Sequence, residues 1–187
     1  MSFYPAKPLG AYGDAGAVLC KDDALFDTMK SVRVHGEGAS RYEYARIGIN
    51  SRLDTIQAAI LLAKLEVFAE EIQMRQRVAD AYNSRLGNAV KTPKVIDGAQ
   101  STWAQYTIEV DDRDAFRAHL AEQGVPTAIY YPIPLHLHAP YASYPVAPGG
   151  LPVTEAAAGR VVSLPMHPDM PGGDIDRVVA AVTGFRG

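Results

Sequence analysis

The stretch SFYPAKPLGAYGDAGAVLC, residues 2–20, governs how the fold of the whole chain is interpreted. Pro5 and Pro8 fix two backbone φ angles, and each biases the residue before it toward an extended conformation. The amine of Lys7, held in so stiff and partly apolar a turn, could act as a nucleophile toward carbonyl groups. From spacing alone, an exposed lysine in a terminal arm is the favoured alternative.

Composition limits what the 187 residues can be. Hydrophobic residues make up 48% of the chain and charged residues 21%, with a net charge of −3. This balance gives no electrostatic reason to expect nucleic acid or an anionic membrane as a partner. No apolar run reaches the ~18 residues of a membrane span, no secretory leader is evident, and Cys20 is the only cysteine. We therefore expect a cytoplasmic protein without an internal disulfide, in which Cys20 is a buried thiol.

The first fifty residues are predicted to hold one strand and one helix. The apolar run at 16–20 indicates a short buried strand, and residues 22–35 indicate a helix with acidic residues at its N-terminus. Residues 35–50 contain three glycines and no periodicity, which predicts a loop. A loop of that length in a compact domain is usually functional or mobile.

The clearest helix follows this loop and extends to about residue 86. Five residues form one apolar stripe at spacings of three and four: Leu53, Ile56, Ile60, Ala63 and Val67. Ser51 and Asp54 resemble a capping box at its start, and Gly87 marks its end. Because about 34 residues is long for one globular helix, we expect a kink or a break near Ala69.

Helices and strands alternate in the second part of the chain. The predicted elements are strands at 103–110 and 126–131, helices at 112–124 and 172–185, and a segment at 153–164 that changes from helix to strand. A proline-rich loop spans residues 132–152. This order predicts an α/β fold with a boundary near residues 87–101.

Three later motifs accompany the opening stretch: GINSRLDTIQAAIL at 48–61, IYYPIPLH at 129–136 and SLPMHPDM at 163–170. In this order the four motifs resemble the DegT/DnrJ/EryC1/StrS family of sugar aminotransferases, over nearly the whole chain. The resemblance implies a pyridoxal-phosphate enzyme of fold type I, the aspartate aminotransferase fold. Residues 1–87 would be a remnant of the large cofactor-binding domain, and residues 88–187 the small α/β C-terminal domain.

The resemblance also implies roles for individual residues. Lys7 would form the Schiff base with pyridoxal phosphate and move a proton between the cofactor and the substrate carbon. Ser2 and Asn50 would contact the cofactor phosphate, Asn50 from across a dimer interface. The substrate-binding residues implied in the same way are Tyr130, Tyr131, His136, His35 and Arg41. The substrate would be a nucleotide-linked keto-sugar, with glutamate as the amino donor.

Each of these residues also has a purely structural interpretation. Ser2 would be an ordinary residue near the chain start, and Asn50 would cap a helix. The paired tyrosines would be half-buried packing, and Arg41 a solvated loop charge. Arg52 is expected to fix local structure. The other histidines show no metal-ligand spacing, so no metal site is predicted.

The resemblance predicts amination of a UDP-linked 3-keto-sugar for O-antigen or lipopolysaccharide biosynthesis, by a homodimer. Family members carry a further N-terminal half, so we expect a C-terminal fragment that is inactive alone. The alternative is a non-catalytic remnant that binds a sugar nucleotide or a protein partner. Ala15 stands where the family has glycine, and the change is harmless only if its φ is negative.

Overall fold

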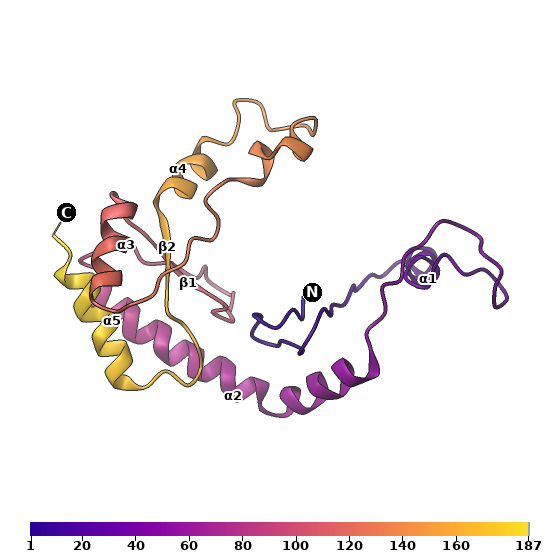
Figure 1. The fold of residues 1–187 in the computed structure, drawn as a ribbon, viewed down its shortest axis with the longest axis horizontal. Coiled ribbons are helices and arrows are strands. Elements are labelled where there is room, and N and C mark those ends of the chain that lie inside the picture. Colours follow the sequence, from indigo (N-terminus) through magenta and orange to yellow (C-terminus); the bar gives the residue numbers. More distant parts are fainter. Residues whose placement is uncertain (187) are drawn as a thin grey trace. The chain divides into compact units, whose positions relative to one another are not determined.

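The computed structural model describes residues 1–186 and shows a mixed chain of helices and strands (Figure 1). Internal contacts divide it into two units, Met1–Ala69 and a second unit from Glu70 onward. The division falls inside a long helix and not at residue 87, because the second half of that helix packs into the core of the second unit. The assignment of residues 1–87 and 88–187 to two domains of a longer parent fold stays a prediction. No helix in the described residues has the length and apolarity needed to cross a membrane.

The first unit contains helix α1, Asp23–Val32, and the first half of helix α2, Thr55–Leu86. The Asp22 carboxylate caps α1 by accepting a hydrogen bond from the backbone N–H of Leu25 at 2.7 Å, which confirms the helix predicted there. α2 runs without interruption for 32 residues, so this segment is one helix and not two. Its sequence contains no glycine or proline that would interrupt it.

The predicted buried strand at 16–20 is wrong. Only an isolated bridge between Ser2 and Gly16 forms, and the side chains of Val18 and Leu19 are 73% and 79% exposed. The described residues offer no neighbouring strand to complete a ladder, so this apolar segment stays uncovered. Cys20 is partly exposed for the same reason, and its thiol donates to the Asp22 carbonyl at 3.5 Å.

The predicted loop at 35–50 is present and is closed at its base. Isolated bridges join Val34 to Asn50 and Glu37 to Tyr44. Gly36 has a φ of 82°, and a Cβ there would collide with the carbonyl of Arg46 on the opposite limb of the loop. Glycine is therefore required where the two limbs approach each other.

The second unit is built on an antiparallel strand pair that joins Tyr106 to Leu164 and Glu109 to Val161. Its remaining regular structure is helical. The α-helices follow in the order that the sequence predicts, and two short 3₁₀ helices lie within the segment 132–152 that is predicted as a loop. The elements are β1 (Tyr106–Glu109), α3 (Arg113–Glu122), the short 3₁₀ helices η1 (Leu135–Leu137) and η2 (Ala139–Tyr141), α4 (Pro152–Arg160), β2 (Val161–Leu164) and α5 (Gly172–Gly184). The strand predicted at 126–131 contributes only a bridge between Ala128 and Ser163.

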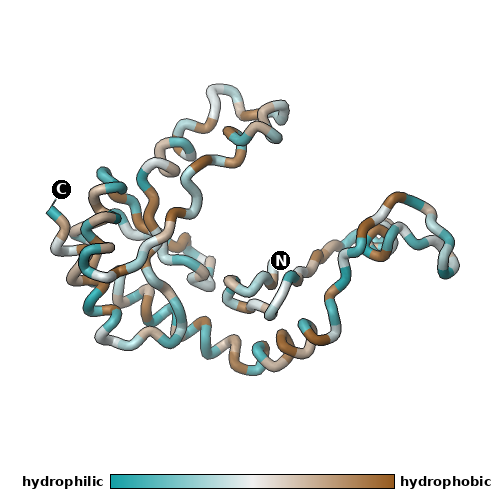
Figure 2. Tube along the Cα trace, viewed as in Figure 1, coloured by the Kyte–Doolittle hydropathy of each residue, from teal (hydrophilic) through white to brown (hydrophobic). Residues whose placement is uncertain are grey.

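Aromatic and aliphatic side chains from α2, α3, α5 and both strands form the core of the second unit. The largest fully buried ones are Tyr82, Leu86, Tyr106, Ile108, Phe116 and Leu120. The Tyr82 hydroxyl donates to the Pro165 carbonyl at 2.9 Å, and the Tyr106 hydroxyl donates to Asn83 Oδ1 at 2.6 Å. Both phenols are thus buried with their polar ends satisfied. Figure 2 shows the hydrophobic stretches that cross this unit at β1 and β2.

Candidate functional site

Lys7 lies in a loop whose two ends are joined. The backbone N–H of Phe3 donates to the Ala15 carbonyl at 2.9 Å, and the N–H of Lys7 donates to the Tyr4 carbonyl at 2.8 Å, closing a turn across Pro5. The side chain of Lys7 is exposed, and within residues 1–186 its Nζ makes no hydrogen bond or ion pair. The turn therefore presents a free primary amine. Ala15 does not have a positive φ, so alanine is tolerated there.

Helix α2 holds this lysine loop through two polar side chains. Gln57 Oε1 accepts a hydrogen bond from the backbone N–H of Tyr12 at 2.7 Å. Lys64 Nζ donates to the Gly10 carbonyl at 2.7 Å and lies 5.1 Å from the centre of the Tyr12 ring. A Cβ at Gly10 would lie 2.6 Å from the Pro5 carbonyl oxygen, so the tight turn needs glycine.

Sequence reasoning missed Gln57 and Lys64 and selected the wrong face of α2. Two members of the predicted apolar stripe, Ile56 and Val67, are 73% and 49% exposed, whereas Leu61 is 6% exposed. Gln57, Leu61 and Lys64 follow the spacing of one helix face. The sequence signal for this face was the pair Gln57 and Lys64, seven residues apart with Leu61 between them. This face is polar because it binds the backbone of a glycine-rich loop.

Ser2 and Asn50 both present polar atoms at the surface of the first unit. Ser2 lies in the lysine loop, and its Oγ accepts from the Tyr4 backbone N–H at 3.3 Å. Asn50 is not a helix cap, because α2 begins only at Thr55. For the same reason Ser51 does not cap this helix. Arg52 Nε donates to Asn50 Oδ1 at 3.1 Å, as expected for a residue that fixes local structure.

His35 and Arg41 occupy different parts of the loop at 35–50. His35 lies at the base next to Asn50, with a φ of 61°, and its backbone N–H donates to the Ile49 carbonyl at 2.9 Å. Arg41 lies farther out, with its guanidinium carbon 5.0 Å from the Tyr42 ring centre. Both side chains are exposed. No hydrogen bond or ion pair in the described part of the chain joins this loop to the lysine loop.

In the second unit, Tyr130, Tyr131 and His136 lie close together in the sequence after the Ala128 bridge. The rings of the two tyrosines are 5.6 Å apart and are 42% and 66% exposed, so both are partly open to solvent. The His136 ring is largely covered, and its Nε2 lies 3.0 Å from Glu155 Oε1. No group of histidine, cysteine and acidic side chains within residues 1–186 could hold a metal ion.

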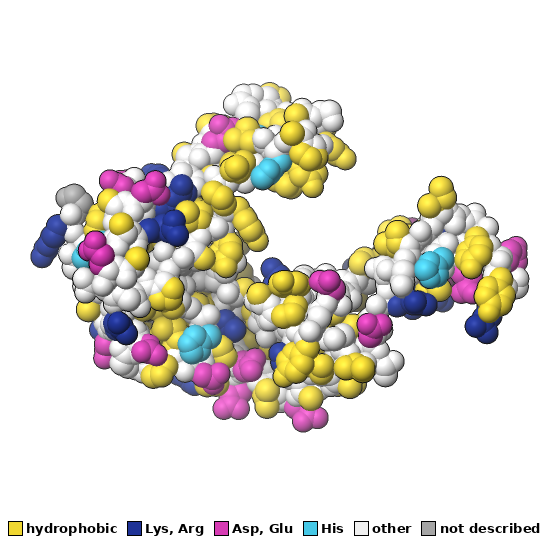
Figure 3. All heavy atoms as spheres, in the orientation of Figure 1, with side chains coloured by type: hydrophobic (Ala, Val, Ile, Leu, Met, Phe, Trp, Pro, Cys, Tyr) yellow, Lys and Arg dark blue, Asp and Glu magenta, His cyan; other side chains and the backbone are white. Residues whose placement is uncertain are grey.

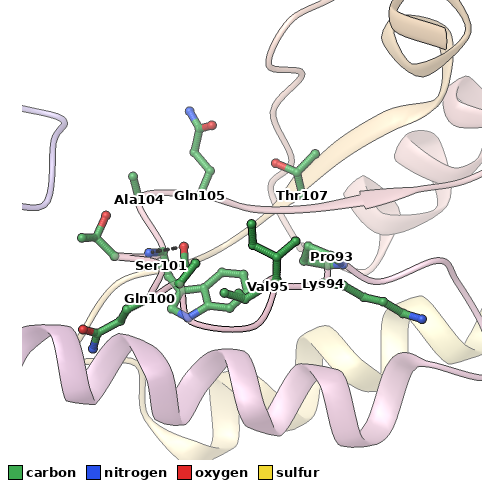
Figure 4. Close-up of a pocket in the computed structure, with 12 residues that line it drawn as sticks. Pro93, Lys94, Val95, Gln100, Ser101, Ala104, Gln105 and Thr107 are labelled. Carbon is green, nitrogen blue, oxygen red and sulfur yellow. Dashed lines mark hydrogen bonds between the residues drawn. The ribbon is translucent and has the colours of Figure 1, made fainter.

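An open hollow of about 570 Å³ lies elsewhere in this unit, beside the start of β1 (Figure 4). Pro93 and Val95 line one part of it, and Gln105 and Thr107 extend into view from the opposite segment. The described lining residues include none of the predicted site residues.

A model of the DegT/DnrJ/EryC1/StrS aminotransferase family matches residues 1–183. The chain belongs to this family. Its α/β fold is that of part of a fold-type-I aminotransferase chain, as the sequence predicts.

Relatives within the DegT/DnrJ/EryC1/StrS family are similar over almost the whole of this chain. The UDP-2-acetamido-2-deoxy-3-oxo-D-glucuronate aminotransferase of Pseudomonas aeruginosa is 46% identical over 183 residues, which are 97% of this chain and 50% of that protein. A solved family aminotransferase from Brucella abortus has a TM-score of 0.94 and 52% identity, covering 100% of this chain and 50% of the other. NtdA from Bacillus subtilis, solved with bound cofactor PMP, has a TM-score of 0.84 and 27% identity, covering 98% and 44%. This chain therefore spans about half the length of the relatives it matches.

Proposed function

We propose that this chain is the lysine-bearing part of a pyridoxal-phosphate-dependent aminotransferase that acts on a nucleotide-linked keto-sugar. The observation that carries the proposal is the exposed Lys7 amine, presented by a loop that α2 holds at Gly10 and Tyr12. Family membership supports the same reaction. Because the chain spans about half of its relatives, we assign the activity to the whole protein and expect no turnover from these residues alone.

The residues present fit pyridoxal phosphate. When bound, the cofactor supplies an aldehyde that reacts with amines and a ring that withdraws electrons from the substrate carbon. Lys7 Nζ, which has no competing partner within residues 1–186, would hold the cofactor and carry a proton to and from the substrate carbon. Ser2 Oγ and the Asn50 amide, both exposed, would donate hydrogen bonds to the cofactor phosphate. We place Asn50 in the site of a second copy, which makes the working enzyme a homodimer.

The substrate side of the proposal rests on five exposed or half-covered side chains. Arg41 suits a diphosphate because its guanidinium forms paired hydrogen bonds. His35 would act beside it on the same loop, while Tyr130, Tyr131 and His136 would contact the sugar nucleotide from the second unit. The named substrate of the Pseudomonas relative supports a UDP-linked 3-keto-sugar, with glutamate as donor. We assign the product to O-antigen or lipopolysaccharide sugar synthesis in the cytoplasm.

Trapping of the cofactor on a lysine tests this proposal. The chain is mixed with the separately expressed N-terminal half of the Pseudomonas relative, pyridoxal phosphate is added, and the sample is reduced with borohydride. We expect a visible to near-ultraviolet absorption band before reduction, and one peptide modified at Lys7 after it. The band should vanish in Lys7→Ala and persist in Lys21→Ala, whose exposed lysine makes no polar contact within residues 1–186.

Two results would contradict the assignment. Labelling of a different lysine, or a band that survives Lys7→Ala, would show that Lys7 does not hold the cofactor. A well-folded mixture that shows no band would instead support a non-catalytic remnant. Turnover by the 187 residues alone would contradict the expectation that the chain is inactive by itself.

A further inference from the structure

Residues 132–150 form an arm that projects from the second unit with little to hold it (Figures 1 and 3). Of residues 131–150, only Pro134 and His136 are partly buried, and all the others are exposed. Apolar side chains gather on the arm and stay largely open to solvent; Leu135, Leu137, Tyr141, Tyr144 and Val146 are 41–66% exposed. A segment with so few buried residues has little apolar packing to fix its position.

Among the described residues, one side-chain hydrogen bond joins this arm to the rest of the unit. His136 Nε2 lies 3.0 Å from Glu155 Oε1, with the histidine side chain 16% exposed and the glutamate 47%. A carboxylate only accepts hydrogen bonds, so the imidazole N–H is the donor. Within the described residues, it is the only hydrogen bond between residues 132–150 and the remainder of the chain, since the arm's other bonds are local turns.

The partner of His136 stands on a helix that is itself well anchored. Glu155 is in the first turn of α4, where a negative charge is favoured by the helix dipole. One turn later, the Arg113 guanidinium of α3 donates to the Ala158 carbonyl of α4. At the end of α4, immediately before β2 begins, Arg160 Nη2 donates a hydrogen bond to Asp111 Oδ1 at 2.8 Å. A continuous line of contacts therefore runs from the strand pair through α4 to the arm.

We propose that Glu155 is a positioning residue, which clasps the arm to α4 through His136. Without this clasp no hydrogen bond within the described residues would join the arm to the rest of the unit. The consequence for catalysis rests on the proposed function: Tyr130 and Tyr131 directly precede the arm, so the clasp also sets where these substrate-contacting rings are held.

Hydrogen exchange on the 187-residue chain tests the clasp without any cofactor or substrate. In Glu155→Ala, we expect amides of η1 and η2 to exchange about two- to fivefold faster, the range for loss of a partly exposed ion pair. The exchange rates of peptides from β1 should not change, so these peptides serve as an internal reference. Glu122→Ala is the matched control, because this exposed glutamate of α3 makes no hydrogen bond or ion pair within residues 1–186.

Conservative and double variants separate a specific clasp from a general effect. Glu155→Gln keeps an acceptor oxygen and should restore most of the protection, whereas His136→Ala should match Glu155→Ala. The double variant should exchange no faster than either single one, as for two partners of one contact. Unchanged exchange in Glu155→Ala, or faster exchange spread evenly over the whole unit, would overturn the proposal. In the assembled enzyme we expect Glu155→Ala to raise the KM for the sugar nucleotide with little change in kcat; lack of activity there would count against the proposed function and not against the clasp.

Discussion

At the scale of single residues, the position of the loop that carries Lys7 depends on a second lysine. Lys64 donates a hydrogen bond to the Gly10 carbonyl and lies over the Tyr12 ring, while Gln57 accepts a hydrogen bond from the Tyr12 backbone N–H. Hydrogen bonds to charged groups are stronger than neutral ones, and this contact is partly buried. The geometry of the turn that presents Lys7 therefore depends on side chains two helical turns apart on α2.

Replacement of Lys64 tests this dependence. Lys64→Met keeps the length of the side chain but removes the donor, and we expect amides of residues 10–14 to exchange about fivefold faster, corresponding to about 1 kcal/mol. Lys21→Met, an exposed lysine with no polar partner within residues 1–186, is the control. Equal exchange in the two variants would show that Lys64 does not hold the loop.

Two glycines with positive φ differ in the space around them, so their substitution separates backbone strain from steric collision. Gly36 and Gly98 both have positive φ, of 82° and 77°, but only at Gly36 would a new Cβ meet another limb of the chain. We expect Gly98→Ala to lower local stability by about 1 kcal/mol and Gly36→Ala to lower it by several times that. Hydrogen exchange of the amides around each site measures both effects. If the two substitutions cost the same, the loop at 35–50 is not closed as described.

Some site residues could be identified from sequence and others could not. The proline frame around Lys7 predicts a turn, and the turn is present. Asn50 was compatible with a helix cap, because the start of α2 could not be located to better than a few residues. Gln57 and Lys64 escaped notice because their partners are backbone groups of a distant loop, and such pairs leave no periodic apolar signal.

At the scale of elements, the two buried phenols of the second unit make its stability sensitive to alkaline pH. Burial raises the pKa of Tyr106 above its ordinary value, and burial together with the neighbouring Tyr106 and Asp174 does the same for Tyr82. The folded state therefore keeps both protons at a pH where the unfolded chain releases them, near 10. By linkage, stability is unaffected well below pH 10 and falls as pH rises above it.

Urea unfolding between pH 8 and 11 measures this effect. We expect the free energy of unfolding to fall by up to about 1.4 kcal/mol per pH unit for each tyrosine above pH 10. Tyr106→Phe should be less stable at pH 8, because Asn83 loses its partner, but should show a smaller alkaline slope. The same slope in both proteins would mean that the Tyr106 proton is not retained.

The elements that could be predicted are those whose determinants are local. Asp22 and Asp112 cap α1 and α3 at the predicted starts, and the alternation of helix and strand after residue 101 predicts the second unit in outline. The segment 16–20 has an equally clear apolar pattern but forms no strand. A strand needs a neighbour, and no local pattern reports whether one is present.

At the scale of the whole molecule, the chain leaves much apolar surface uncovered. Val18, Leu19, Ile47 and Ile56 of the first unit are between 73% and 97% exposed. Removing such surface from water contributes about 25 cal/mol per Å². Patches of this kind mark places where other polypeptide packs, and the relatives carry about as much chain again.

Self-association is therefore expected of the isolated chain. Sedimentation velocity across the micromolar range should show an average mass that rises with concentration. The double variant Val18→Lys, Leu19→Glu should weaken this association without changing net charge, whereas Val153→Lys, at an exposed position of the second unit, should not. A strictly monomeric wild-type chain would contradict the expectation.

The bridge between Ala128 and Ser163 has a consequence for how the protein can diversify. On its N-terminal side the projecting segment leaves the strand pair at this bridge, and the core of the unit includes no side chain from residues 131–150. Insertions, deletions and substitutions beyond the bridge are thus decoupled from the packing that keeps the unit folded. That segment can therefore change in sequence and length without loss of the fold, while the contact between its imidazole and the neighbouring carboxylate requires both residues to be kept together.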